Sequence, residues 1–272
     1  MSHIDPLASV HPGAKLGKDV TAGPFAVIEE GAVVGDGCVI GPHALVTRWA
    51  RLGNEVKLAK GTVVGTDPQD LKFAGEETTA HVGDRTVLRE FVTVNRGTTY
   101  HMKTVVGSDC LLLAYSHVAH DCVVGDHVIL DNGVQLAGHV EVGDWVIIGG
   151  LSGVQQFVHI GAHAFVGGMC GVRKDIPPYV KAAGEPVSFA GTNNIGLARR
   201  GFEKERIIAI QGAYRTLYRS GLLLKDAVEK LKSESQTKDV ENIIRFIENR
   251  SKHGLMGGPR TRKVTDQADG EE

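Results

Sequence analysis

Residues 123–148 read VVGDHVILDNGVQLAGHVEVGDWVII, and this stretch decides the fold. Every sixth residue in it is aliphatic, and turn-forming residues such as glycine and aspartate lie between. The same frame extends from Ile4 to Val172, where 25 of 29 positions hold Ile, Leu or Val against about 7 expected from the composition. The repeat is therefore not a chance pattern. Its members in the quoted stretch are Val124, Leu130, Leu136, Val142 and Ile148.

A six-residue repeat of this kind predicts a solenoid. Short strands of period two, interrupted every six residues by a glycine-containing corner, give three flat faces per coil and about 18 residues per turn. Successive coils then stack as parallel strands, with residue n beneath residue n+18. We therefore predict a mainly β chain that forms a parallel β-helix over residues 1–189.

The four cysteines share one type of position in this frame. Each lies four residues after an aliphatic residue, where other coils carry Ala, Val or Ser. A free thiol suits such an inward position as a small core residue. We therefore interpret them as core residues rather than as disulfides or a zinc cage. They are Cys38, Cys110, Cys122 and Cys170.

The frame fails at Asp70, Glu76 and Tyr100 and ends near residue 189. Residues 69–81, QDLKFAGEETTAH, carry polar residues where the core should be, so we predict an external loop there. Beyond the repeat, helical spacing predicts a small C-terminal domain of three short α-helices over residues 190–253. The final residues 254–272 are poor in apolar types and are predicted to be disordered.

Composition restricts the classes of partner. The net charge is −2, and no segment approaches the roughly 18 apolar residues that a membrane span needs. We expect a cytoplasmic protein without nucleic-acid binding or stable membrane insertion. Residues 190–263 nevertheless hold 16 Lys and Arg against 8 Asp and Glu. This surplus fits either an ordinary solvated helical face or a docking surface for an acidic partner.

The stretch SHVAHDC, residues 116–122, contains several potential metal ligands. The frame directs Ser116 and Cys122 inward and turns His120 and Asp121 out at a corner. Reactive residue types concentrate along this edge of the solenoid. A constant step of 18 also assigns Arg85, His101, Gly138, His139 and Gln156 to it.

Stacking suggests a role for each of these residues. Gly138 lies above His120, and His139 lies above Asp121. His120 is suited to act as a general base, Asp121 can fix its tautomer, and the Gly138 N–H can face a developing oxyanion. Zinc binding is the rival interpretation, because trimeric β-helix carbonic anhydrases hold zinc with histidines from two subunits.

The motifs SHVAHDC, LAGHVEVGD, QDLKFAGE, VGGMCGV, DIPPYV and NNIGLARRGF resemble, in order over residues 4–250, those of the acyl-[acyl-carrier-protein]–UDP-N-acetylglucosamine O-acyltransferases, which open lipid A biosynthesis. The resemblance implies a left-handed coil and a homotrimer with active sites between subunits, without metal or cofactor. It implies transfer of a (3-hydroxy)fatty acyl chain from acyl carrier protein to the glucosamine 3-hydroxyl of UDP-N-acetylglucosamine. The acidic carrier protein would then be the partner of the basic helices.

The same resemblance implies roles for individual residues. His120 would be the general base, Asp121 its orienting partner and Gly138 the oxyanion donor. Gly168 matches the position that sets acyl-chain length, where glycine leaves room for a long chain. The implied substrate contacts are His117 and His139 in the cleft, Asp70 and Lys72 at the sugar, Gln156, Asn193 and Arg200 at the nucleotide, and Arg199 near the acyl donor.

Two positions depart from the family pattern. Gln155 stands where many relatives carry histidine, and Ile195 where relatives often carry an acidic residue. Both leave room for a related activity, N-acylation of a UDP-3-amino sugar on the same scaffold. A zinc hydratase and a non-catalytic scaffold are the remaining alternatives from other classes.

Overall fold

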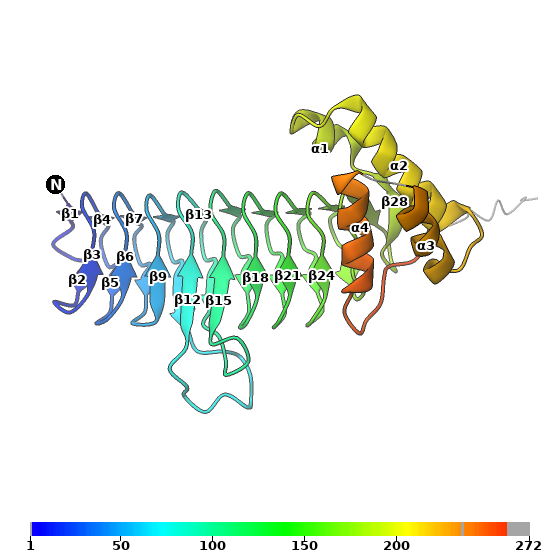
Figure 1. Ribbon diagram of the computed structural model, residues 1–272. Coiled ribbons are helices and arrows are strands. Elements are labelled where there is room, and N and C mark those ends of the chain that lie inside the picture. The colour runs from blue at the N-terminus through cyan, green and yellow to red at the C-terminus, as the bar shows by residue number, and fades with distance from the viewer. Residues whose placement is uncertain (1, 235–236, 260–272) are drawn as a thin grey trace, which may run out of the picture.

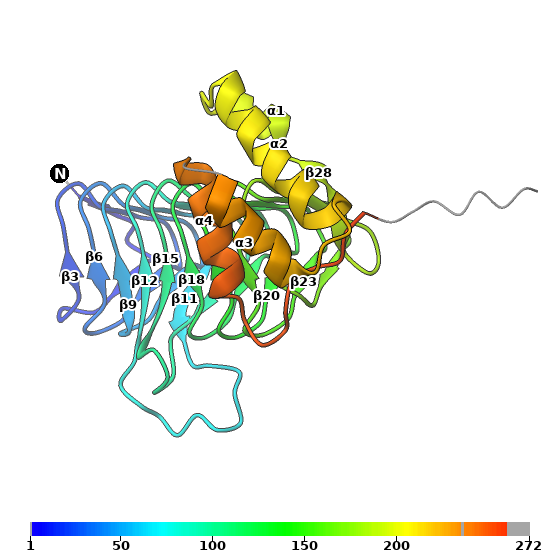
Figure 2. The ribbon, with the colours of Figure 1, turned by 45° about the vertical axis from the view of Figure 1, so that its right-hand side comes forward.

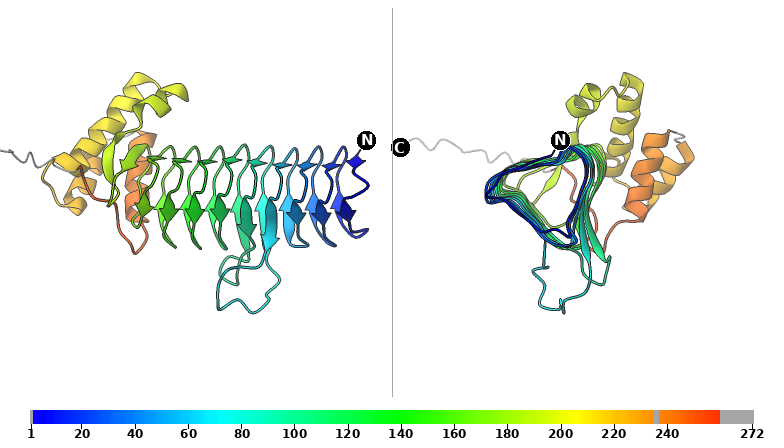
Figure 3. Two further views of the ribbon diagram at one scale, coloured as in Figure 1. Left: turned by 180° about the vertical axis from the view of Figure 1, so that it is seen from behind. Right: turned by 90° about the vertical axis from the view of Figure 1, so that its left-hand side faces the viewer.

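The computed structural model describes residues 2–234 and 237–259. The chain winds into a triangular prism with three parallel sheets, here called A, B and C, as the end-on view in Figure 3 shows. Val106 pairs with Val124, and Val124 with Val142, so each of these coils contains 18 residues. The predicted β-helix is confirmed.

The sheets consist mostly of strands of two residues. Sheet A contains β1 (His3–Ile4), β4 (Thr21–Ala22), β7 (Val39–Ile40), β10 (Lys57–Leu58), β13 (Val87–Leu88), β16 (Leu111–Leu112), β19 (Ile129–Leu130), β22 (Ile147–Ile148), β25 (Phe165–Val166), β27 (Val180–Ala183) and the antiparallel β28 (Ser188–Thr192). Sheet B contains β2 (Ser9–Val10), β5 (Val27–Ile28), β8 (Leu45–Val46), β11 (Val63–Thr66), β14 (Thr93–Asn95), β17 (His117–Val118), β20 (Gln135–Leu136), β23 (Gly153–Val154) and β26 (Gly171–Val172). Sheet C contains β3 (Lys15–Leu16), β6 (Val33–Val34), β9 (Ala50–Leu52), β12 (Thr79–Val82), β15 (Lys103–Val106), β18 (Val123–Val124), β21 (Glu141–Val142) and β24 (His159–Ile160).

The core fills the centre of the prism. Frame residues such as Leu130 and Leu136 are fully buried and stack in columns along the axis. All four cysteines lie in this core as predicted, and the thiol of Cys122 donates to the carbonyl of Ala137. Burial raises the pKa of Cys122 to about 12, as expected for a thiol that serves only for packing.

Two insertions leave the coil at the edge between sheets B and C, which we call the B–C edge (Figure 1). The first spans residues 67–78 between β11 and β12; the predicted loop, 69–81, ended too late because residues 79–81 already belong to β12. The second spans residues 96–102 between β14 and β15 and was visible in the sequence only as the break at Tyr100.

The second insertion also corrects one assignment. Val82 pairs with Val106, 24 residues later, so the constant step of 18 does not hold here. Arg85 therefore lies on the edge between sheets C and A, the C–A edge, where it forms a two-pronged ion pair with Asp109. The sequence had placed Arg85 on the reactive edge, and that placement is wrong.

The C-terminal segment packs against the end of the prism (Figures 1 and 2). Its four helices are α1 (Asn194–Arg199), α2 (Lys204–Arg219), α3 (Leu224–Glu234) and α4 (Lys238–Glu248). The helical spacing predicted the last three and missed α1, which has only six residues. In the described part of the chain, no helix is long and apolar enough to cross a membrane.

Residues 254–257 are ordered, contrary to the predicted tail. Leu255 bridges to Asp175 and Gly257 to Ser188, and Met256 is buried. Residues 258–259 are also described, whereas residues 260–272 of the predicted tail lie outside the described residues.

Candidate active site

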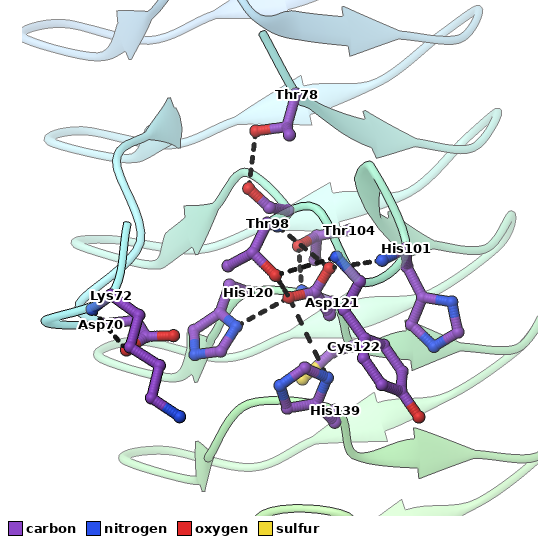
Figure 4. Close-up of polar contacts among 12 residues, drawn as sticks. Asp70, Lys72, Thr78, Thr98, His101, Thr104, His120, Asp121, Cys122 and His139 are labelled. Carbon is purple, nitrogen blue, oxygen red and sulfur yellow. Dashed lines mark hydrogen bonds and ion pairs between the residues drawn. The ribbon is translucent and has the colours of Figure 1, made fainter. Parts of the chain in front are cut away.

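A histidine–carboxylate pair occupies the B–C edge, at the corner between β17 and β18. His120 Nδ1 lies 2.8 Å from Asp121 Oδ2 (Figure 4). Because an ionised carboxylate can only accept hydrogen bonds, Nδ1 carries the proton and Nε2 keeps a free lone pair. The His120 side chain is 12% exposed and Asp121 is fully buried. The pair therefore presents one basic nitrogen from a fixed ring.

The Asp121 carboxylate is held by more than the histidine. Oδ1 accepts from the backbone N–H groups of Thr98 at 3.0 Å and His101 at 3.1 Å, and Oδ2 accepts from the Thr98 hydroxyl at 2.7 Å. Burial opposes ionisation, but the hydrogen bonds from His120, Thr98 and His101 outweigh it and hold the pKa of Asp121 well below its ordinary value. Asp121 is thus ionised at neutral pH.

Gly138 lies one coil further, directly against the base. A Cβ at this position would be 2.5 Å from His120 Cε1, closer than any real contact, so the packing requires glycine. Its carbonyl accepts from the N–H of Phe157. Its own N–H has no acceptor among the residues that the structure describes. A free N–H beside a general base is suited to hold an oxyanion.

Two further histidines flank the base. His117 Nδ1 lies 2.7 Å from Thr93 Oγ1, and burial together with the neighbouring His120 lowers the pKa of His117. His139 stacks on Phe157 with ring centroids 4.2 Å apart, and burial lowers its pKa as well. Both rings are therefore held neutral near the base.

A groove of about 540 Å³ runs from His120 across the outer face of sheet B. Gln155 and Gln156, two coils beyond His120, line it, and so does Gln69 of the first insertion. The neighbouring Asp70 accepts from the N–H of Lys72 at 3.0 Å, and its charge slightly opposes the burial that lowers the pKa of His139, so the insertion reaches the site (Figure 4). The structure thus brings together His117, His120, Asp121, Gly138, His139, Gln156, Asp70 and Lys72.

The other predicted contacts lie on different edges of the prism. Asn193 caps α1 and donates to the carbonyl of His163 on the C–A edge. Arg200 lies over the Trp145 ring on that same edge, and Arg199 lines a concavity of about 370 Å³ over sheet A. Gly168 lies at the corner between β25 and β26, on the edge between sheets A and B. Within one chain, sheet C separates the Asn193 and Arg200 group from His120.

The comparisons with known proteins agree with this geometry. Hexapeptide-repeat models of bacterial transferases match residues 13–48 and 103–138, and the model of UDP-N-acetylglucosamine O-acyltransferase domain 2 matches residues 175–256. The acyl-[acyl-carrier-protein]–UDP-N-acetylglucosamine O-acyltransferase of Chlorobaculum parvum is 55% identical over 91% of this chain and 94% of its own. The chain belongs to this acyltransferase family.

Solved structures of the family superpose closely. The enzyme from Bacteroides fragilis gives a TM-score of 0.91 at 42% identity and covers 93% of this chain and 99% of its own. The enzyme from Francisella novicida gives 0.91 at 33% identity and covers 99% of both chains. The left-handedness of the β-helix, which was predicted from the family resemblance, is confirmed.

One cluster of side chains at the site contains residue types that bind metal ions in proteins. Nitrogen and oxygen atoms of His120, Asp121 and His139 lie within 4.8 Å of one another. Both carboxylate oxygens of Asp121 already accept two hydrogen bonds each, from Thr98, His101 and His120. Since a metal would have to displace those donors, the arrangement fits an orienting carboxylate better than a zinc ligand.

Sequence reasoning missed two residues of the site, Thr98 and Arg96. Thr98 binds the carboxylate, and Arg96 is buried beneath the first insertion. Neither lies in the hexapeptide frame, and the only available signal was the charged, glycine-containing stretch NRGTTYH at the failure of the repeat.

Proposed function

We propose that this protein transfers a (3-hydroxy)fatty acyl chain from acyl carrier protein to the 3-hydroxyl of UDP-N-acetylglucosamine, the first step of lipid A biosynthesis. The observation that carries the proposal is the His120–Asp121 pair with the Gly138 N–H beside it, at the head of an open groove. Family membership supports the same reaction, because the relatives are named for it.

The chemistry needs a base, an oxyanion donor and no metal. His120 Nε2 takes the proton from the sugar 3-hydroxyl as its oxygen attacks the thioester carbonyl carbon. The Gly138 N–H stabilises the negative charge on the carbonyl oxygen. When the tetrahedral intermediate collapses, the C–S bond breaks and the leaving thiolate takes the proton back from His120. Asp121 stays ionised throughout and stabilises the imidazolium.

The direct test is a product assay. The purified protein is incubated with acyl carrier protein thioesters of several lengths, and with both a 3-hydroxy and a 3-amino UDP-sugar, and the products are identified by mass spectrometry. We expect O-acylation, and His120→Ala should reduce the rate by a hundredfold or more. If only N-acylation is found, the acceptor is the amino sugar and not UDP-N-acetylglucosamine. A near wild-type rate for His120→Ala would exclude His120 as the general base.

We further propose a cytoplasmic homotrimer with each site shared between two copies. This proposal is supported by sheet C, which separates Asn193 and Arg200 from His120. Because of this separation, a single chain cannot bring the two halves of the site together. A column of exposed apolar side chains on the edge between sheets A and B also favours burial against another copy. It comprises Leu7, Phe25, Phe91, Tyr115, Leu151 and Met169.

A mixing experiment tests the shared site. His120→Ala and Arg200→Ala variants are each expected to be nearly inactive as pure trimers. Coexpressed and randomly assembled, they should regain activity at about a quarter of the sites, because each intact site then takes its base from one copy and its arginine from another. Absence of any recovery in mixed trimers would place both residues in one subunit's site.

The acyl donor contacts are proposals of the same kind. The basic helices would steer the acidic carrier protein; on α2, Arg215 and Arg219 line a concavity of about 390 Å³. Gly168 is exposed, and a Cβ there would lie 3.2 Å from the Gly150 carbonyl oxygen, so a larger side chain would occupy space at this edge that glycine leaves open. Gly168→Met should therefore shorten the preferred acyl chain in the same product assay.

A further inference from the structure

We propose that Arg96 and Thr98 are positioning residues that join the substrate loop, residues 67–78, to the Asp121 carboxylate. Both belong to the second insertion, which the reaction described above does not otherwise use. The inference rests on the proposed function, in which Asp121 orients the base and the loop carries Asp70 and Lys72 to the sugar.

Thr98 controls the carboxylate. It donates twice to Asp121, from its N–H to Oδ1 at 3.0 Å and from its hydroxyl to Oδ2 at 2.7 Å. Oδ2 is also the atom that His120 contacts, at 2.8 Å. Two donors on the two oxygens fix the rotation of the carboxylate plane, and this plane determines where the His120 ring points. Thr98 is buried, so water does not replace it.

Arg96 holds the loop. Its guanidinium carbon lies over the Trp49 ring and over the Phe73 ring, 4.6 and 4.7 Å from their centroids. It forms an ion pair with Asp67 at 2.8 Å, and it donates to the Glu76 carbonyl oxygen. The Arg96 side chain is 4% exposed. One buried cation thus contacts the start, the middle and the end of the loop, which a lysine could not do because it lacks the planar fork.

Gly97 connects the two residues rigidly. Its carbonyl accepts from the Thr78 hydroxyl at 2.5 Å and its N–H donates to the Thr79 carbonyl. A Cβ on Gly97 would lie 2.4 Å from the backbone nitrogen of Lys103, so position 97 has no room for a side chain (Figure 4 shows Thr78 and Thr98). Through these two hydrogen bonds, a displacement of the end of the loop acts on Gly97 and on the adjacent Thr98.

Steady-state kinetics with both substrates test the two halves separately. Thr98→Val keeps the side-chain shape and the N–H but removes the hydroxyl; we expect kcat to fall about tenfold with KM for UDP-N-acetylglucosamine within twofold, and Thr98→Ser to restore kcat. Arg96→Lys should raise KM for the sugar nucleotide about tenfold or more, with KM for the acyl carrier protein unchanged.

Matched controls separate positioning from general packing. Thr62→Val removes a buried hydroxyl that donates to the Arg89 carbonyl, away from the site. Glu77→Gln removes an exposed carboxylate of the same loop that has no polar partner among the described residues. Both should leave kcat and KM within twofold, even if the melting temperature of Thr62→Val falls as far as that of Thr98→Val.

Three outcomes overturn the inference: an unchanged kcat in Thr98→Val, an unchanged sugar KM in Arg96→Lys, or identical effects of both variants that follow only their loss of thermal stability. If Arg96→Lys does not fold, Asp67→Asn breaks the same anchor from its exposed end, and an unchanged sugar KM there is equally decisive. Failure of the proposed function itself is distinguishable, since the wild-type protein would then form no O-acylated product in the same assay.

Discussion

Replacing Gly138 by alanine tests the geometry of the base directly. The added Cβ would lie 2.5 Å from His120 Cε1 and 2.6 Å from Nε2. Carbon atoms in contact prefer about 3.5 Å, so the imidazole must retreat by about 1 Å. Such a movement disrupts its 2.8 Å hydrogen bond to Asp121. A displacement of that size at a reacting centre costs about a hundredfold in rate.

The assay is kcat/KM for acyl transfer, measured together with the free energy of unfolding. We expect a loss of about a hundredfold and a destabilisation of about 1–3 kcal/mol, because the buried Asp121 loses one of its donors. A double-mutant cycle with His120→Ala isolates the cause. Since the clash acts through the ring, Gly138→Ala should cost much less in a chain that already lacks the ring.

Gly138→Ala retains its N–H, so the oxyanion donor is chemically unchanged in this variant. Two results would refute the reasoning: a wild-type kcat/KM for Gly138→Ala, or a full additional hundredfold loss in the double variant. The first would show that the base tolerates displacement, and the second that position 138 acts independently of His120.

Three further predictions concern the Asp121 carboxylate, the buried thiols and helix α2. The pKa of Asp121 is lower in the folded than in the unfolded chain. Its ionised form therefore stabilises the fold above about pH 4, and this contribution disappears as pH falls further. The free energy of unfolding of Asp121→Asn should consequently fall less steeply with acidification than that of wild type. Burial raises the pKa of Cys110 to about 11 and that of Cys122 to about 12. A thiol reagent at pH 8 should therefore label neither cysteine until the protein is unfolded. Rapid labelling of the native protein would contradict the inward positions of these side chains. Gly212 in α2 has open space at its Cβ position, so Gly212→Ala should raise the free energy of unfolding by about 0.5–1 kcal/mol without changing kcat, and a destabilised variant would contradict the helical packing.

The hexapeptide frame predicts the fold because the burial pattern repeats in the sequence itself. It could not predict which faces carry residues 79–95, since the second insertion adds six residues and so preserves the phase of the repeat while rotating the chain by one face. Arg85 was misplaced for this reason. His120 and Gly138 were placed correctly because both follow the second insertion, where the step of 18 holds.

The site residues that the sequence did not predict lie outside the six-residue repeat. Thr98 reaches Asp121 through a hydrogen bond between residues 23 positions apart, from a segment whose path depends on Arg96 and Gly97. No local propensity encodes such a contact. Helix α1 was missed for a similar reason, because it has only six residues and buries only Leu197.

The oxyanion donor is a backbone N–H at a corner of the coil, a type of group that is hydrogen-bonded at other corners. On the C–A edge, the N–H of the second corner residue is repeatedly satisfied by a side chain from the next coil, as Ser108 and Asp126 show with the carboxylates of Asp126 and Asp144. On the B–C edge the residue above His120 is Gly138, and the N–H of Gly138 has no such acceptor among the described residues. One residue thus serves the site twice: its missing side chain makes room for the imidazole, and its backbone N–H is free beside the ring. The two properties are separable, because a larger residue at position 138 would displace the imidazole while its N–H remained.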